Sequence, residues 1–296
     1  MATTKRPTWM GRPSATVKTA KALAIVFLIA IVVVPFWVVL ATSFASNDDV
    51  TGNGGYVLWP MHPTTEAYQQ VFTNGIVTKA LIVSAAVTLL GTAISLAATV
   101  LLAYALARPG VYGGKPAMLF ILFTFLVPPG IIPAYLVVQN LGLLDSYGSL
   151  VLPVLVNAFN VVIMRGFFQG IPEDLYSAAR LDGAGEWRIL TRVVLPLSKA
   201  VVAVVGLFYA VGYWNAFFNA ILYLNDSSRW PLQAVLRLYV IQGAQLGDNT
   251  SDAGASIAPQ SIQMAAVVVA TVPILCVYPF LQRYFVKGVL TGAVKS

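Results

Sequence analysis

The sequence predicts an all-α, polytopic membrane protein with six transmembrane helices. Of its 296 residues, 58% are hydrophobic and only 10% are charged, and the mean hydropathy is +0.79. So little charge is atypical of a soluble domain of this length. Runs without charge, each long enough for a helix to cross a hydrocarbon core of about 30 Å, define six spans at 22–47, 80–107, 116–144, 146–164, 200–225 and 253–282.

The first run follows five basic residues, a pattern shared with secretory signal peptides. Its apolar core is longer than the roughly 7 to 15 residues of such a peptide, which favours a retained transmembrane helix. We therefore expect residues 1–20 to form a cytoplasmic tail and residues 21–296 to form a single transmembrane domain.

The distribution of basic residues predicts the orientation of the spans. With a cytoplasmic N-terminus, 15 of the 18 Lys and Arg residues lie inside, and only Lys79, Arg229 and Arg237 lie outside. Cytoplasmic loops of membrane proteins carry such an excess of positive charge. Both termini are therefore expected in the cytoplasm, and topology explains the net charge of +7 without a nucleic-acid partner.

The second span has a sequence typical of close helix packing, whereas the third span has one that interrupts a helix. Gly91, Ser95 and Thr99 recur every four residues in the second span, which predicts a small-residue face for close helix packing. The third span contains VPPGIIP at 127–133. Prolines inside a span remove backbone hydrogen bonds, so this sequence indicates either a broken helix that lines a transport path or a simple kink.

Polar side chains in the fourth and fifth spans are candidates for a solute path. A buried amide is costly in lipid unless it bonds to another helix or to a polar group in a cavity. The two explanations remain open here. Under the second, the candidate residues of the path are Asn157, Asn160, Tyr213, Trp214, Asn215 and Asn219.

The charged segment 171–197 lies between the fourth and fifth spans, on the cytoplasmic side. Pro172 fits a first helical position, with Glu173 and Asp174 in the first turn. Gly183 supplies the left-handed residue that ends such a helix, and a second short helix is expected from Gly185 onward. By pattern alone, the segment could equally be an amphipathic connector on the membrane surface.

Eight residues of this segment resemble the E-A-A-x-x-x-G…I-x-L-P signature of binding-protein-dependent ABC importer permeases, and the chain has Ser177 and Val193 where that signature has Glu and Ile. The resemblance implies that this segment is a coupling helix that docks on an ATP-hydrolysing subunit. The residues that it assigns to this role are Ser177, Ala178, Ala179, Asp182, Gly183, Ala184, Leu195 and Pro196.

Further positions are similar to the carbohydrate-type permeases related to the smaller membrane subunit of the maltose importer. These are 128–135, Gly142-Leu143, Trp214-Asn215 and Lys287-Gly288. The resemblance implies a bacterial inner-membrane permease for a sugar or oligosaccharide. Its partners would be a second, different permease, two ATP-binding subunits and an external substrate-binding protein, with ATP and Mg²⁺ on the ATPase.

The chemistry expected of rival functions is missing from the sequence. The only histidine, His62, and the only cysteine, Cys276, provide neither a metal site nor a catalytic pair. No G-x-x-x-x-G-K-[ST] phosphate loop is present, and no Asp, Glu or Lys lies inside a span to couple ions. A membrane-embedded enzyme and a secondary transporter or channel are thus less favoured, and a permease for another small polar solute remains an alternative.

Overall fold

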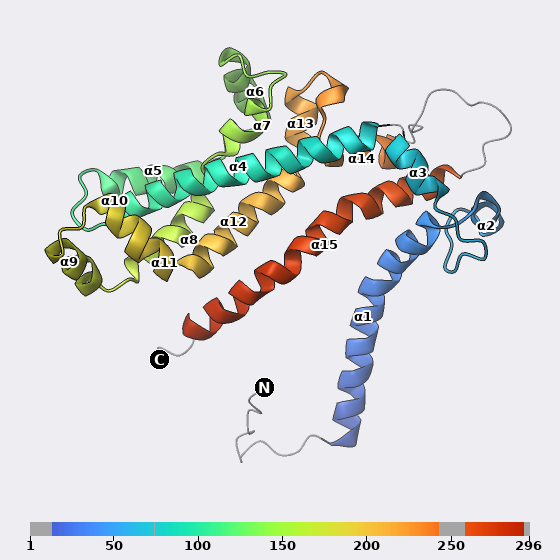
Figure 1. The fold of residues 1–296 in the computed structure, drawn as a ribbon, viewed down its shortest axis with the longest axis horizontal. Helices are drawn as coiled ribbons and strands as arrows, with labels where there is room; N and C mark the ends of the chain where they lie inside the picture. The colour runs from blue at the N-terminus through green and yellow to red at the C-terminus, as the bar shows by residue number, and fades with distance from the viewer. Residues whose placement is uncertain (1–13, 74, 243–257, 293–296) are drawn as a thin grey trace. The chain divides into compact units, whose positions relative to one another are not determined.

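The structure is a computed structural model that describes residues 14–73, 75–242 and 258–292. Within these ranges it is all-α, as predicted, with a single isolated bridge between Ala45 and Pro63. The elements in Figure 1 are α1 (Ala15–Ser43), α2 (Asn47–Gly52), α3 (Glu66–Thr73), α4 (Ile76–Ala107), α5 (Gly114–Leu126), α6 (Ile131–Asn140), α7 (Gly148–Val151), η1 (Leu152–Val154), α8 (Ala158–Gln169), α9 (Glu173–Leu181), α10 (Glu186–Ile189), η2 (Leu190–Val194), α11 (Leu195–Leu197), α12 (Lys199–Trp214), α13 (Phe218–Tyr223), η3 (Ser227–Arg229), α14 (Leu232–Gln242) and α15 (Pro259–Gly292).

Three helices, α1, α4 and α15, are long and apolar enough to cross a membrane unaided. Three further pairs of helices pass the same test only when each pair counts as one bent span. The bends measure 118° between α5 and α6, 52° between α7–η1 and α8, and 86° between the α10–α11 segment and α12. The described chain therefore has six possible spans only if each of these three bent pairs is counted as one span.

The third span is a broken helix, one of the two outcomes that its prolines indicated, with a bend of 118°. Interruptions inside the expected fourth and fifth spans were not predicted. The turn between α5 and α6 contains Val127 and Gly130, inside the proline-rich sequence. The expected span 146–164 is interrupted before Asn157, whose side-chain oxygen accepts a hydrogen bond from the N–H of Asn160 and caps α8. The expected span 200–225 ends as a helix at Trp214 and resumes as α13.

Contacts divide the chain into two compact units, one with residues up to Gln69 and part of α15 up to Val268, the other with the rest. The expectation of one transmembrane domain over 21–296 stays a prediction. Of the expected tail 1–20, residues 1–13 lie outside the described range, and α1 already begins at Ala15, capped by Ser14.

The first unit is held by hydrogen bonds between the end of α1 and the loop that follows it. Ser43 bonds to the Tyr68 hydroxyl at 2.7 Å, and Trp37 Nε1 donates to the carbonyl of Leu58 at 2.8 Å. Trp59 is 67% exposed and lies beside the Trp37 ring, with 5.8 Å between the ring centroids.

The second unit is built around α4, which packs against α5, α7, α8, α12 and α14 and runs beside α12 and α8 in Figure 1. The predicted small-residue face of α4 lies against α12. A Cβ on Gly91 would stand 2.9 Å from Cζ of Tyr213, so only glycine admits this ring. The face therefore serves close packing, as the four-residue spacing indicated.

Candidate functional site

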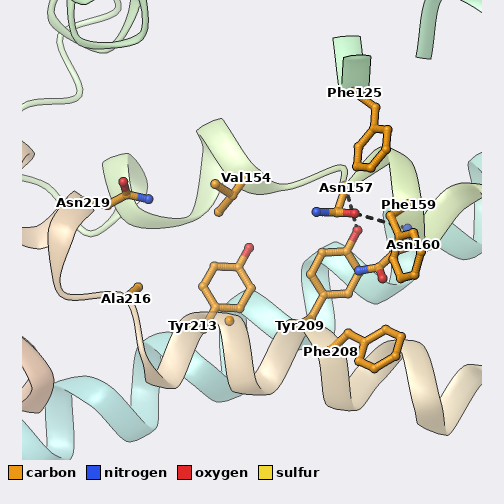
Figure 2. A pocket seen from close by; sticks show the side chains of 11 residues that line it. Phe125, Val154, Asn157, Phe159, Asn160, Phe208, Tyr209, Tyr213, Ala216 and Asn219 are labelled. Atoms are coloured by element: carbon orange, nitrogen blue, oxygen red, sulfur yellow. Dashed lines mark hydrogen bonds between the residues drawn. The ribbon is translucent and has the colours of Figure 1, made fainter. Parts of the chain in front are cut away.

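A pocket of about 480 Å³ lies in the second unit, at the places where its helices break (Figure 2). It is reached by side chains from the end of α5, from η1 and α8, from α12, and from the turn that leads to α13. No charged residue is among the described residues that line it: Phe125, Val154, Asn157, Phe159, Asn160, Phe208, Tyr209, Gly212, Tyr213, Ala216 and Asn219.

The two tyrosine hydroxyls of the pocket are engaged with the protein itself. Tyr209 OH shares a hydrogen bond with Thr99 Oγ1 at 2.7 Å and accepts another from the backbone N–H of Asn157 at 2.9 Å. Tyr213 OH bonds to Ser95 Oγ at 2.7 Å. The hydroxyls therefore fix the pocket wall to α4 and to the break before α8, and the rings offer aromatic surface to a solute.

The amides are the polar groups that remain available to a ligand. Asn157 uses its side-chain oxygen to cap α8. Asn160 is 4% exposed and lines the pocket, and its side-chain amide makes no hydrogen bond to any residue that the structure describes. The Asn160 amide is not among the fully buried polar atoms that lack a partner, so it keeps some access to the open space of the pocket, where a polar solute could bond to it. Asn219 lines the same pocket from α13.

Four of the six path residues suggested by the sequence line this pocket, and two do not. Trp214 is buried at 8% exposure, outside the pocket. Asn215 is exposed, and its Nδ2 donates to the carbonyl of Val211 at 2.9 Å at the end of α12. Sequence reasoning missed Tyr209 and the three phenylalanines. Tyr209 precedes Tyr213 by four residues, and Ser95 precedes Thr99 by the same number. This equal spacing was the signal in the sequence that could have paired the two tyrosines with these hydroxyls.

The segment 171–197 forms two helical stretches, as predicted: α9, and a second stretch from Glu186 to Leu197 that includes the π-helical turn η2. Pro172, expected at the first helical position, is instead the N-cap of α9. Helix α9 ends at Leu181, and Gly183 has φ +73°. The N–H of Gly183 donates to the carbonyl of Arg180, and the N–H of Ala184 donates to that of Ala179. These two bonds form the Schellman motif, which requires a left-handed residue.

The candidate coupling residues divide between the surface and the core. Ala179, Ala184 and Leu195 are partly buried and pack against the hydrophobic core of the second unit. The other five are exposed: Ser177, Ala178, Asp182, Gly183 and Pro196.

Two large apolar side chains are exposed beside them. Leu181 is 90% exposed and Trp187 is 68% exposed. An exposed apolar patch rimmed by polar residues is typical of a protein contact surface.

A charged cluster joins this segment to the end of α4. The Tyr104 hydroxyl donates to Glu186 Oε2, and Arg108 Nη2 lies 3.5 Å from Glu186 Oε1. Arg180 Nη2 is 3.1 Å from the same oxygen. The hydrogen bonds from Tyr104 and Arg180, together with the positive charges of Arg108 and Arg180, hold the pKa of Glu186 below its ordinary value. The Arg108 guanidinium carbon lies 4.0 Å from the centre of the Tyr176 ring.

The comparisons with known proteins agree with one another. Residues 99–291 match the sequence model of the family described as binding-protein-dependent transport system inner membrane component. The chain is 46% identical over 268 residues to the polygalacturonan/rhamnogalacturonan transport system permease protein of Bacillus subtilis, covering 90% of this chain and 93% of the relative. It is 30% identical over 270 residues to the diacetylchitobiose uptake system permease protein of Streptomyces coelicolor, covering 90% and 85%.

A solved structure has the same fold. It is a chain from the crystal structure of a bacterial ABC transporter involved in the import of the acidic polysaccharide alginate, with a TM-score of 0.86 and 29% identity. The match covers 93% of this chain and all of that one (100%). The resemblance seen in the eight residues of segment 171–197 thus extends over most of the molecule.

Proposed function

The chain belongs to the family of binding-protein-dependent transport system inner membrane components, and from this premise we propose that its pocket forms part of the path of a carbohydrate. As a member of that family it is a multi-pass inner-membrane permease of an ABC transporter, and it is not an enzyme. The proposed substrate is an oligosaccharide, since the relatives are named for transport of polygalacturonan/rhamnogalacturonan and uptake of diacetylchitobiose, and the solved structure for import of the polysaccharide alginate.

The observation that carries the proposal is the composition of the pocket wall. Three phenylalanines and two tyrosines surround three asparagines. Aromatic faces suit the apolar face of a sugar ring, and amides can both donate to and accept from its hydroxyls. The unpartnered amide of Asn160 supplies the polar contact that fixes a sugar in place.

Energy for transport is proposed to come from a separate subunit. The exposed residues Ser177, Ala178, Asp182 and Gly183, with the apolar side chains of Leu181 and Trp187, would seat the segment in an ATPase that binds ATP and Mg²⁺. Closure of two such ATPases would draw the segments together and change which side of the membrane the pocket faces.

The remaining partners are proposed from the family and from α1. A second permease completes the path, and an external binding protein delivers the sugar, with both termini of this chain in the cytoplasm. Helix α1 is apolar enough to span a membrane, so its surface suits contact with lipid or with the second permease.

The proposed path is tested by transport in the assembled complex. Asn160→Ala and Asn219→Ala are expected to lower uptake of an oligosaccharide loaded on the binding protein, because each removes an amide from the pocket. A lost hydrogen bond of this kind costs about 1 kcal/mol, or about fivefold in rate. Asn215→Ala is the matched control, since that amide bonds to its own helix and should leave uptake near the wild-type value.

Two outcomes would overturn the proposal. One is equal uptake by all three variants and the wild-type complex, which would remove the pocket from the path. The other is a binding protein that accepts no oligosaccharide and delivers a different small polar solute.

A further inference from the structure

The Arg108 guanidinium is an unusual group to find at the end of α4. Its side chain is 9% exposed, and both of its Nη atoms are buried without a hydrogen-bond partner in the described chain. A buried charge of this kind is costly unless an opposite charge compensates it. The compensation consists of the carboxylate of Glu186 at 3.5 Å and the ring faces of Tyr176 and Tyr104 at 4.0 and 5.6 Å.

Glu186 is held from two sides. Its Oε1 faces Arg108 of α4 and Arg180 of α9, while its Oε2 accepts the hydrogen bond of Tyr104. Two of these three contacts come from Tyr104 in the last turn of α4 and from Arg108, the residue that caps its C-terminus, so the carboxylate joins the segment 171–197 to the end of that helix. An ordinary exposed ion pair contributes little to stability, but this one compensates the charge of Arg108, whose side chain is only 9% exposed.

The same α4 helix is hydrogen-bonded to two residues that line the pocket. About one to three turns before Tyr104, Ser95 and Thr99 bond to the hydroxyls of Tyr213 and Tyr209, the two tyrosines that line the pocket. A helix bonded continuously from Ile76 to Ala107 moves as a rigid rod over this distance. Any displacement of its cytoplasmic end therefore reaches the pocket wall.

We propose that Glu186 and Arg108, with the Tyr104 hydroxyl, form the joint through which movement of α9 and α10 shifts α4 and, through Ser95 and Thr99, the pocket tyrosines. Glu186 and Arg108 are then positioning residues, since neither touches the solute. The inference rests on the proposed function, because it presumes that the segment is moved by an ATPase.

The first test compares two carboxylates of the same segment in the complete importer. Glu186→Gln removes the joint, whereas Glu173→Gln removes a carboxylate of nearly equal exposure, 54% against 55%, that does not contact α4 in the described structure. We expect Glu186→Gln to lower the ratio of binding-protein-stimulated to basal ATP hydrolysis about fivefold or more. Glu173→Gln should keep the wild-type ratio.

A double-mutant cycle then asks whether the two charges act together. Arg108→Gln and Glu186→Gln should each lower the ratio, and the double variant should lose no more than the worse single one. Additive losses would overturn the joint. Tyr104→Phe preserves the ring and removes only the hydroxyl, so it carries the test if Arg108→Gln does not accumulate in the membrane.

The pocket gives a readout that a purely structural role would not change. In a background with Cys276→Ser, a cysteine at Asn219 should change its labelling rate when ATP is added to the wild-type complex, and this response should disappear with Glu186→Gln. If the response persists in Glu186→Gln, the joint is wrong. If labelling in the wild-type complex does not respond to ATP and the complex transports no oligosaccharide, the proposed function itself is wrong.

Discussion

Among the described glycines, Gly91 is the one where an added methyl group would meet another atom most closely. An added Cβ would lie 2.9 Å from Cζ of Tyr213, and the ring cannot easily retreat because its hydroxyl is bonded to Ser95. Overpacking of this kind costs about 1 to 3 kcal/mol.

Gly91→Ala is therefore expected to lower the thermal stability of the detergent-solubilised protein by that amount. Gly166→Ala in α8 is the control, because a Cβ there meets no atom within 4 Å, and it should be neutral or slightly stabilising. Equal stability of the two variants would contradict the close contact.

Single residues also show what the sequence could not reveal. The spacing of Gly91, Ser95 and Thr99 predicted a packing face, but their partners Tyr209 and Tyr213 lie far along the chain. The direction in which Trp214 and Asn215 point depends on how α12 is rotated against α4. That rotation is set by the tyrosine hydroxyl bonds, which only the fold brings together.

At the scale of an element, the end of α9 tests the coupling role of the segment. Gly183 has φ +73° with no atom within 4 Å of an added Cβ, so a substitution there suffers backbone strain and not a clash. Gly183→Val should cost about 1 to 2 kcal/mol and weaken co-purification of the ATPase subunit. Gly183→Asn should be nearly harmless, because asparagine tolerates this conformation.

The contrary result has a clear meaning. If Gly183→Val binds the ATPase and supports stimulated hydrolysis as well as Gly183→Asn does, the turn is not part of the docking surface. The segment would then be the amphipathic connector that its sequence pattern also allowed.

Asp145 joins the loop after α6 to the loop after α13. Its carboxylate accepts hydrogen bonds from the backbone N–H of Asn225 at 2.6 Å and from Asn225 Nδ2 at 2.8 Å, and its carbonyl accepts one from Arg229. The side-chain and backbone N–H groups of Asn225 hold the pKa of Asp145 below its ordinary value.

This lowered pKa predicts how the stability of the protein depends on pH. The contribution of the ionised carboxylate is fully present above the unfolded-state pKa of about 3.9 and is lost as the pH falls through the lower folded-state value. Asp145→Asn should therefore be less stable than wild type at pH 7, and the difference should shrink below about pH 4.

Thermal unfolding at both pH values measures this difference. Asp48→Asn, at an exposed position in α2, should differ little from wild type at either pH. A constant gap between Asp145→Asn and wild type at the two pH values would show that ionisation is not the source of the stability.

At the scale of the whole molecule, the predicted orientation is tested by cysteine labelling without Cys276. Met61 is 73% exposed in the loop after α1, and Gly185 has ordinary backbone angles with space around it. A cysteine at Met61 should react with an impermeant reagent in intact cells, and one at Gly185 only after permeabilisation. The opposite pattern would reverse the topology and remove the segment from the cytoplasm.

The sequence predicted the number of spans better than their shape. Length and hydropathy identify a stretch that can cross lipid, and the prolines near Val127 marked one break. The breaks at Asn157 and Asn215 occur in charge-free runs, where composition does not change when a helix bends. The pairing of Arg108 with Glu186 was equally hidden, because the two residues are far apart in the sequence and only the fold brings them together.

The broken helices have a consequence for how the protein is made. At about 1.5 Å per residue, the 13 residues of α5, the 10 of α6 and the 12 of α8 each extend about 20 Å or less, short of a bilayer core of about 30 Å. If one of these short helices entered lipid alone, the backbone groups at its end would be left without hydrogen bonds in the membrane. Helix α4 has 32 residues and is long enough to enter lipid by itself. It is also synthesised before every short helix that packs on it.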